Sequence, residues 1–139
     1  MKVYILEDEA AILKYLLALV VDIPYLQLVG YSDTIAKAYP EIKALQPDLI
    51  LADIQLKDGC SFELLQQVHH PNLQLIFITA YSQYAIKALN LGALGYLLKP
   101  VDDIEFTQTI ERCYQKKSTQ KVEEVQLQVA MDHLQSSAS

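Results

Sequence analysis

A chain of 139 residues is long enough to form one domain with its own hydrophobic core. Apolar residues make up 52% of the chain and charged residues 20%, a composition that excludes intrinsic disorder. The formal net charge of −6 opposes an electrostatic grip on DNA or RNA, so direct nucleic-acid binding by this segment is not expected.

Neither a membrane span nor a disulfide is expected. The apolar stretch at residues 13–26 is interrupted by Asp22 and Pro24 and is too short to cross a bilayer. Cys60 and Cys113 lie far apart, outside any metal-ligand spacing, and no signal peptide precedes them. We therefore expect reduced thiols in a cytoplasmic protein with no membrane partner.

Five apolar segments are predicted to be strands. In four of them Val, Ile and Leu run together instead of alternating with polar residues, which is typical of strands buried on both faces of a parallel sheet. The second segment is weaker but has a suitable length and composition. In chain order the segments are residues 2–6, 26–32, 48–53, 73–79 and 95–99.

Helical patterns separate these segments, so that a strand and a helix alternate along the chain. This alternation predicts an α/β fold, a doubly wound five-stranded parallel sheet with five helices and right-handed crossovers. The clearest helix covers residues 102–117 and places Phe106, Ile110, Cys113 and Tyr114 on one stripe.

The chain becomes polar from Ser118 onward. We expect residues 1–117 to form the domain and residues 118–139 to be a linker or a truncated connector to an absent output domain. Residues 119–135 could form a weakly amphipathic helix.

Polar groups follow four of the five predicted strands, at the edge where an open parallel sheet binds its ligands. Singly, such residues are usually turn formers, helix caps or solvated charges, and on that ground we assign Glu9 to the first turn of the next helix. Their coincidence at one edge favours a functional site. The groups are Glu7 and Asp8 after the first strand, Asp53 after the third, Thr79 after the fourth, and Lys99 with Pro100 after the fifth.

The clustered carboxylates predict a site for magnesium, Mg²⁺. Like charges this close raise one another's pKa unless a cation lies among them. Carboxylates, a backbone carbonyl and water form the octahedral oxygen site that Mg²⁺ prefers. Such a metal beside the Thr79 hydroxyl and the Lys99 ammonium suits phosphoryl transfer, with Asp53 as the nucleophile that becomes an acyl phosphate.

Four motifs resemble one family, the receiver domain of bacterial two-component response regulators. They are "LEDE", "LILADIQLKDG", "ITAYSQYAIKAL" and "GALGYLLKPVD", and they stand in family order within residues 1–117. The phrases "TAYSQYAIKAL" and "YLLKP" are most similar to receivers that precede a LytTR-type DNA-binding domain. The resemblance implies the flavodoxin-like receiver fold, with strand order 2-1-3-4-5.

The resemblance also implies roles for the acidic residues. Asp53 would be the phosphoacceptor and would hold the metal together with Glu7, Asp8 and the backbone carbonyl of Gln55. Glu7 stands where aspartate is common, a change that the family tolerates.

The remaining site residues would respond to the phosphoryl group. Lys99 would pair with the phosphoryl oxygens, and its bond to Pro100 would be cis. Thr79 would move to donate a hydrogen bond to the phosphoryl group, and Tyr96 would follow it as the switch residue.

The loop after Asp53 departs from the family pattern. Many receivers have a proline where Lys57 stands and a glycine where Ser61 stands, so we expect this loop to differ in shape. No catalytic group is lost, and a working receiver is expected.

The resemblance implies a sensor histidine kinase as the phosphodonor, and homodimerisation on phosphorylation through the helices near residues 82–91 and 102–117. In a longer protein, dimerisation would bring two output domains together on DNA. The domain would not be an enzyme, beyond catalysing its own phosphotransfer and dephosphorylation.

Three alternatives remain at this stage. A phosphatase of the haloacid dehalogenase type would place its nucleophile after the first strand in a D-x-D motif, whereas Asp53 follows the third strand and Gln55 stands two places later. A flavodoxin-like cofactor binder needs a Gly/Ser/Thr-rich phosphate cradle where "EDEA" stands. A receiver-like interaction module without phosphorylation would show no Mg²⁺-dependent gain in mass with a phosphodonor.

Overall fold

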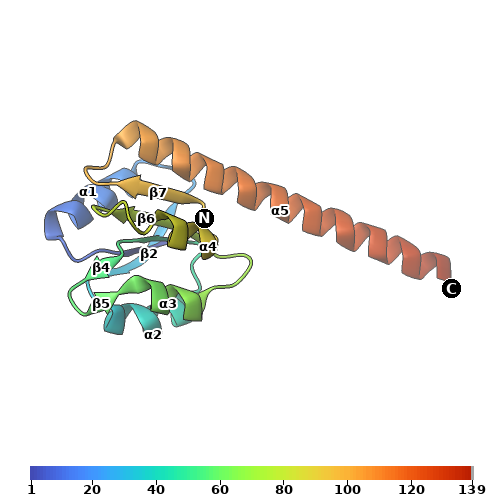
Figure 1. Ribbon diagram of the computed structural model, residues 1–139. Coiled ribbons are helices and arrows are strands. Elements are labelled where there is room, and N and C mark those ends of the chain that lie inside the picture. Colours follow the sequence, from blue (N-terminus) through green and yellow to red (C-terminus); the bar gives the residue numbers. More distant parts are fainter. Residues whose placement is uncertain (139) are drawn as a thin grey trace.

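A computed structural model describes residues 1–138, in which a five-stranded parallel sheet carries helices on both faces (Figure 1). The strand order is β2-β1-β3-β6-β7, which is 2-1-3-4-5 when only the strands of this sheet are counted. The predicted α/β fold and topology are therefore confirmed. The strands are β1 (Lys2–Leu6), β2 (Gln27–Ser32), β3 (Leu49–Ala52), β6 (Gln74–Thr79) and β7 (Gly95–Leu98).

Five helices cover the sheet, with α1 and α5 packed on one face and α2, α3 and α4 on the other. Their bounds are α1 (Ala10–Val21), α2 (Ile35–Leu45), α3 (Ser61–Val68), α4 (Ala85–Asn90) and α5 (Asp103–Ala138).

The two faces of the sheet have separate hydrophobic cores. Along β1, Val3 and Ile5 belong to the core beneath α1 and α5, whereas Tyr4 and Leu6 belong to the core beneath the other three helices. The central strand β6 is buried at every position. This burial on both faces explains why the strand sequences are continuous apolar runs rather than alternating ones.

A short hairpin that was not predicted follows Asp53. It consists of β4 (Gln55–Leu56) and β5 (Gly59–Cys60), joined by a two-residue turn. Gly59 has φ +139°, a region that favours glycine. In the turn, Asp58 accepts hydrogen bonds from the amides of Ile35 and Ala36 at 2.9 and 3.1 Å, so this loop is held against the start of α2.

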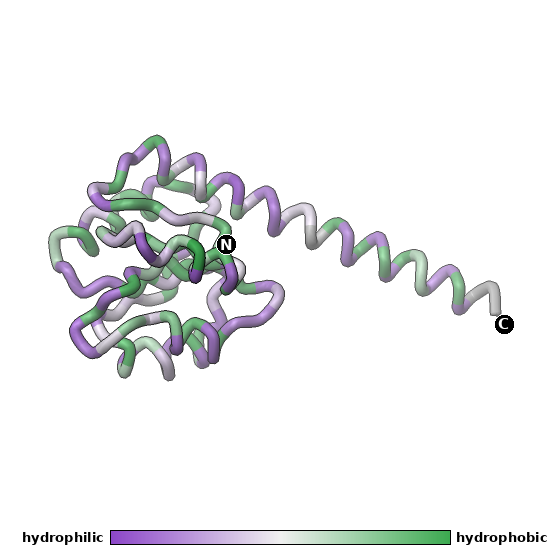
Figure 2. The backbone as a smooth tube through the Cα atoms, in the orientation of Figure 1, coloured by the Kyte–Doolittle hydropathy of each residue, from purple (hydrophilic) through white to green (hydrophobic). Residues whose placement is uncertain are grey.

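Helix α5 is much longer than the predicted helix at residues 102–117. It runs without interruption to Ala138 and projects away from the sheet (Figure 1). From Ser118 onward every side chain that the structure describes is exposed, and hydrophilic and hydrophobic residues alternate along this part (Figure 2). The helix expected at residues 102–117 and the possible helix at residues 119–135 therefore form one continuous helix, so the predicted end at Lys117 is wrong. Ser139 lies outside the described residues.

Near the end of its packed part, α5 is tied to the domain by an ion pair, in which Lys117 Nζ lies 2.9 Å from Asp48 Oδ1. None of the helices that the structure describes is both long and apolar enough to cross a bilayer.

Candidate functional site

The polar groups predicted at the strand ends do meet at one edge of the sheet. Parallel pairing of β1 with β3 places the acidic segment after Leu6 beside Asp53, whose amide donates to the Leu6 carbonyl at 2.9 Å. Pairing of β6 with β7 places Lys99 beside Thr79 in the same way, with the Lys99 amide 2.9 Å from the Thr79 carbonyl. Neighbouring strands, rather than sequence neighbours, therefore assemble the site.

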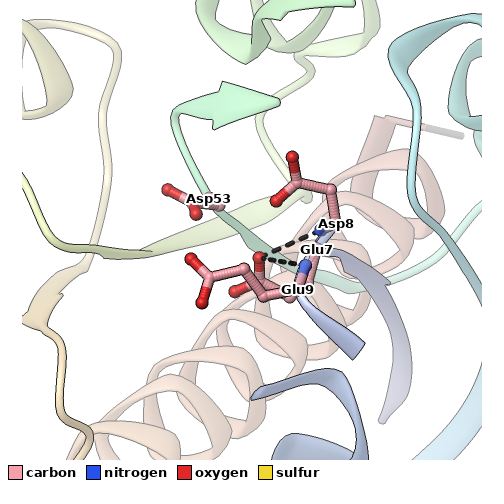
Figure 3. A group of neighbouring side chains, drawn as sticks. All are labelled: Glu7, Asp8, Glu9 and Asp53. Atoms are coloured by element: carbon pink, nitrogen blue, oxygen red, sulfur yellow. Dashed lines mark hydrogen bonds between the residues drawn. The ribbon is translucent and has the colours of Figure 1, made fainter. Parts of the chain in front are cut away.

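Four carboxylates form the centre of this site. One oxygen from each of Glu7, Asp8, Glu9 and Asp53 lies within 4.8 Å of the others (Figure 3). Glu7 is only 1% exposed and Asp53 only 5%, whereas Glu9 is exposed. Buried carboxylates in such a group need compensating positive charge.

The Lys99 ammonium supplies positive charge to this group. Its Nζ atom lies 2.7 Å from Asp53 Oδ2, 2.8 Å from Glu7 Oε1 and 3.3 Å from Glu9 Oε1. Burial alone would lower the pKa of Lys99, but the hydrogen bonds and attraction from Asp53 and Glu7 outweigh it, and the pKa is raised. Lys99 is therefore a fixed cation, and its bond to Pro100 is cis as expected.

Glu7 is held by its own chain as well as by Lys99. Its Oε2 accepts hydrogen bonds from the amides of Asp8 and Glu9 at 3.0 and 3.3 Å, drawn as dashed lines in Figure 3. Burial raises the pKa of Glu7 to about 7, although the lysine opposes this change. A carboxylate that is costly to ionise in this place is a good candidate to gain from a bound cation.

Glu9 lies at the start of α1, but its side chain has a different role from the one predicted. It is the N-cap residue of that helix, but its side chain makes no capping hydrogen bond. Its carboxylate instead joins the acidic group and pairs with Lys99. The assignment to the first turn overlooked this contact because nothing local in the sequence brings residue 99 beside residue 9.

Thr79 and Tyr96 are linked through Tyr81. Thr79 is fully buried, and its hydroxyl accepts a hydrogen bond from the Tyr81 amide at 3.4 Å. The Tyr96 hydroxyl donates to the Tyr81 carbonyl. Burial raises the pKa of Tyr96, which therefore remains a neutral hydrogen-bond donor at neutral pH. The two predicted switch residues thus lie on one hydrogen-bonded path through Tyr81.

Gln55 begins the hairpin after Asp53, and its side-chain amide donates to the Tyr84 hydroxyl at 2.9 Å. The metal-binding role of its backbone carbonyl remains a prediction.

Ser61 is a site neighbour that sequence reasoning treated only as a departure from the family pattern. Its buried hydroxyl donates to the backbone carbonyl of Asp53 at 2.7 Å. A serine in place of the usual glycine was the available signal.

Comparison with known proteins shows the family. The model of the response regulator receiver domain family matches residues 3–111. The chain is 38% identical over 114 residues to the sensory transduction protein LytT of Enterococcus faecalis, covering 81% of this chain and 47% of that protein. It is 32% identical over 124 residues to the transcriptional regulatory protein BtsR of Escherichia coli, covering 87% of this chain and 51% of that protein.

Solved structures show the same fold. The response regulatory domain of protein mrkE from Klebsiella pneumoniae superposes with a TM-score of 0.80 at 25% identity, covering 86% of this chain and 99% of that one. A CheY-like receiver domain from Methanospirillum hungatei gives a TM-score of 0.76 at 24% identity, covering 86% and 97%. The chain spans about half the length of the curated relatives it matches. The chain belongs to the receiver domain family of two-component response regulators and is similar to the receivers of LytT proteins.

Proposed function

We propose that this receiver accepts a phosphoryl group on Asp53 from a sensor histidine kinase. The observation that carries the proposal is the contact of the Lys99 ammonium with both Asp53 and Glu7, at 2.7 and 2.8 Å, in a nearly buried site. A carboxylate nucleophile beside a fixed cation and further acidic groups is an arrangement that serves phosphoryl transfer, which depends on positioning and charge neutralisation.

The residues present fit Mg²⁺. The donors are carboxylate oxygens gathered within 4.8 Å, and two of the four residues are buried, where their negative charge is poorly solvated. Glu7, Asp8, Asp53 and the Gln55 carbonyl would hold the metal, which when bound would neutralise negative charge on the phosphodonor.

In the proposed reaction an oxygen of the Asp53 carboxylate attacks the phosphorus atom. A new O–P bond forms as the bond from phosphorus to the leaving group breaks, and that bond's electron pair departs with the leaving group. The leaving group is the kinase imidazole, or acetate when acetyl phosphate is the donor. Asp53 reacts as a carboxylate and loses no proton, and Lys99 then lies beside the new phosphoryl oxygens.

The switch would use the path from Thr79 to Tyr96. Movement of the Thr79 hydroxyl toward the phosphoryl group would lengthen the hydrogen bond that it accepts from the Tyr81 amide, which is already 3.4 Å long. Displacement of Tyr81 disturbs the carbonyl that accepts from Tyr96. Phosphorylation therefore favours a second position of the Tyr96 ring, because a ligand shifts an equilibrium by its different affinity for the two states.

This rearrangement would act on an exposed apolar surface formed by α4, β7 and the start of α5. Four apolar side chains on these elements are 46 to 75% exposed: Ile86, Leu89, Leu98 and Ile104. Burial of this surface against a second copy would stabilise a homodimer. In a full-length protein, dimerisation in the cytoplasm would bring two DNA-binding output domains together, while this segment itself would not contact nucleic acid.

Intact-mass measurement tests the chemistry. With acetyl phosphate and Mg²⁺ the protein should gain one phosphate, and Asp53→Asn should gain none, because the amide keeps the shape but not the nucleophile. Chelation of the metal should abolish the gain.

A phosphate on Asp53→Asn would overturn the assignment, and no gain in the unaltered protein would favour a non-phosphorylated interaction module. Steady-state release of phosphate from small phosphoesters would favour a phosphatase. Sedimentation with and without beryllofluoride tests the dimer separately.

A further inference from the structure

The hydrogen bond from Ser61 to Asp53 fixes a peptide unit that also holds the reactive carboxylate. The Asp53 carbonyl and the Ile54 amide belong to one planar peptide group. Ser61 Oγ donates to that carbonyl at 2.7 Å, and the Ile54 amide donates to Asp53 Oδ1 at 2.6 Å. Because the unit is rigid, the hydroxyl at one end sets the direction of the N–H at the other.

The remaining contacts leave few other restraints on this peptide. The Asp53 amide is bonded to β1 through the Leu6 carbonyl, and Asp53 Oδ2 is paired with Lys99. Neither contact fixes rotation of the following peptide. Ser61 also donates its own amide to the Ile54 carbonyl at 2.8 Å, so this single residue at the start of α3 closes the loop onto two consecutive carbonyls.

We propose that Ser61 is a positioning residue for Asp53. Through the peptide between residues 53 and 54, its hydroxyl keeps the carboxylate aimed for attack on phosphorus. The inference rests on the proposed phosphorylation of Asp53. It concerns orientation, so it predicts a slower reaction rather than loss of the metal.

Ser61→Ala tests the role by removing only the hydroxyl. At saturating Mg²⁺ we expect the rate of phosphorylation by acetyl phosphate to fall about 3- to 10-fold, the equivalent of one hydrogen bond. Calorimetric Mg²⁺ affinity is measured for each variant, so that the rates are compared with the metal site filled in all of them. Ser61→Thr keeps the hydroxyl and should recover most of the rate.

Thr109→Val is the matched control. The Thr109 hydroxyl is also buried and also donates to a backbone carbonyl, that of Glu105, at 2.8 Å, but within α5. Its loss should change thermal stability without changing the rate of phosphorylation. The backbone carbonyl ¹³C resonance of Asp53 reports directly on the hydrogen bond from Ser61. This resonance should shift in Ser61→Ala and not in Thr109→Val.

The outcomes separate the two proposals. If the unaltered protein gains no phosphate, the proposed function fails. If it does gain phosphate and Ser61→Ala reacts at an equal rate, the positioning role is wrong. Should Ser61→Ala fail to fold, Ser61→Gly provides a second hydroxyl-free variant with the same expected loss of rate. An equal loss of rate in Thr109→Val would mean that the slower phosphorylation reflects lower stability in general, and the positioning role of Ser61 would be wrong.

Discussion

Replacing Lys99 with methionine should strongly destabilise the metal-free protein. Methionine keeps an unbranched chain but removes the ammonium that contacts Asp53 and Glu7. The lysine side chain is 8% exposed and its two partners 5% and 1%, so the remaining charges cannot be well solvated. Loss of one partner from a buried ion pair costs about 3–5 kcal/mol.

We take the lower end of this range, because the carboxylates can still draw partial solvation from the exposed side of the group. For a chain of this length, a loss of about 3 kcal/mol lowers the melting temperature by about 10 °C. Thermal and urea unfolding followed by circular dichroism in chelator measure both quantities. Saturating Mg²⁺ should stabilise Lys99→Met more than the unaltered protein, because the cation then replaces the missing charge.

Lys57→Met is the matched control for this experiment. Lys57 is 62% exposed and its Nζ lies 3.6 Å from Asp33, so the same substitution should cost less than about 1 kcal/mol. Adding Asp53→Asn to Lys99→Met should restore part of the lost stability by removing one carboxylate that has lost its partner. Unchanged stability of Lys99→Met in chelator, or an equal loss in Lys57→Met, would refute the view that Lys99 balances buried charge.

Three further outcomes follow from the packing. Gly95→Ala should cost about 1–3 kcal/mol in urea unfolding, since its Cβ would lie 2.5 Å from Cγ2 of Thr109; Thr109→Ser should relieve most of this loss. Burial raises the pKa of Cys113 to about 12, so iodoacetamide at pH 8 should label it only after unfolding, whereas labelling of native Cys113 as fast as Cys60 would contradict its burial. Burial would raise the pKa of Asp48, but its hydrogen bonds and the nearby lysines outweigh burial and lower the pKa in the folded protein. The ionised Asp48 therefore stabilises the fold above about pH 4, the ordinary pKa of aspartate, and this stabilisation is lost as the pH falls through the lower pKa of the folded state. Asp48→Asn should therefore flatten the acid limb of the stability curve, and an unchanged limb would contradict this.

The sheet and the residues at its strand ends could be predicted because short stretches of sequence are enough to indicate both. A strand covered on both faces has a continuous apolar run, and "LIFIT" of β6 is buried at every residue. In a parallel sheet the residues that follow such runs lie at the same edge, so the sequence alone predicts that Asp53 and Lys99 are close. Their charged groups lie 2.7 Å apart.

The extent of α5 could not be predicted from the criterion used. Polar composition after Lys117 predicts the end of the packed domain and allows a separate weak helix at residues 119–135, but it does not indicate that one helix continues through both segments. Between Asp103 and Ala138 the chain contains no glycine or proline that would stop a helix, so local propensity carries it onward. The long helix is indicated by the lack of a residue that would stop it and not by the hydrophobic pattern.

The contacts of Glu9 and Ser61 depend on tertiary approach, and the sequence around each residue does not indicate its partner. Glu9 meets Lys99 across 90 positions of sequence, and Ser61 reaches Asp53 only because the hairpin folds back. In both cases the residue stands at the start of a helix, Glu9 at the N-cap position of α1 and Ser61 at the first residue of α3, and this position alone explains a polar residue there. A residue whose local position already explains its type can therefore make a long-range contact that the sequence does not indicate.

Strand β7 connects the charge of the site with the proposed output surface. Lys99 follows this strand directly, Tyr96 lies within it, and Leu98 is exposed between them. A phosphoryl group on Asp53 would place new negative charge against Lys99 and would alter the path through Tyr81 to Tyr96. Because the cation directly follows the short strand that holds the proposed switch residue and part of the apolar surface, a change in charge at the site need not travel through the core to reach this surface.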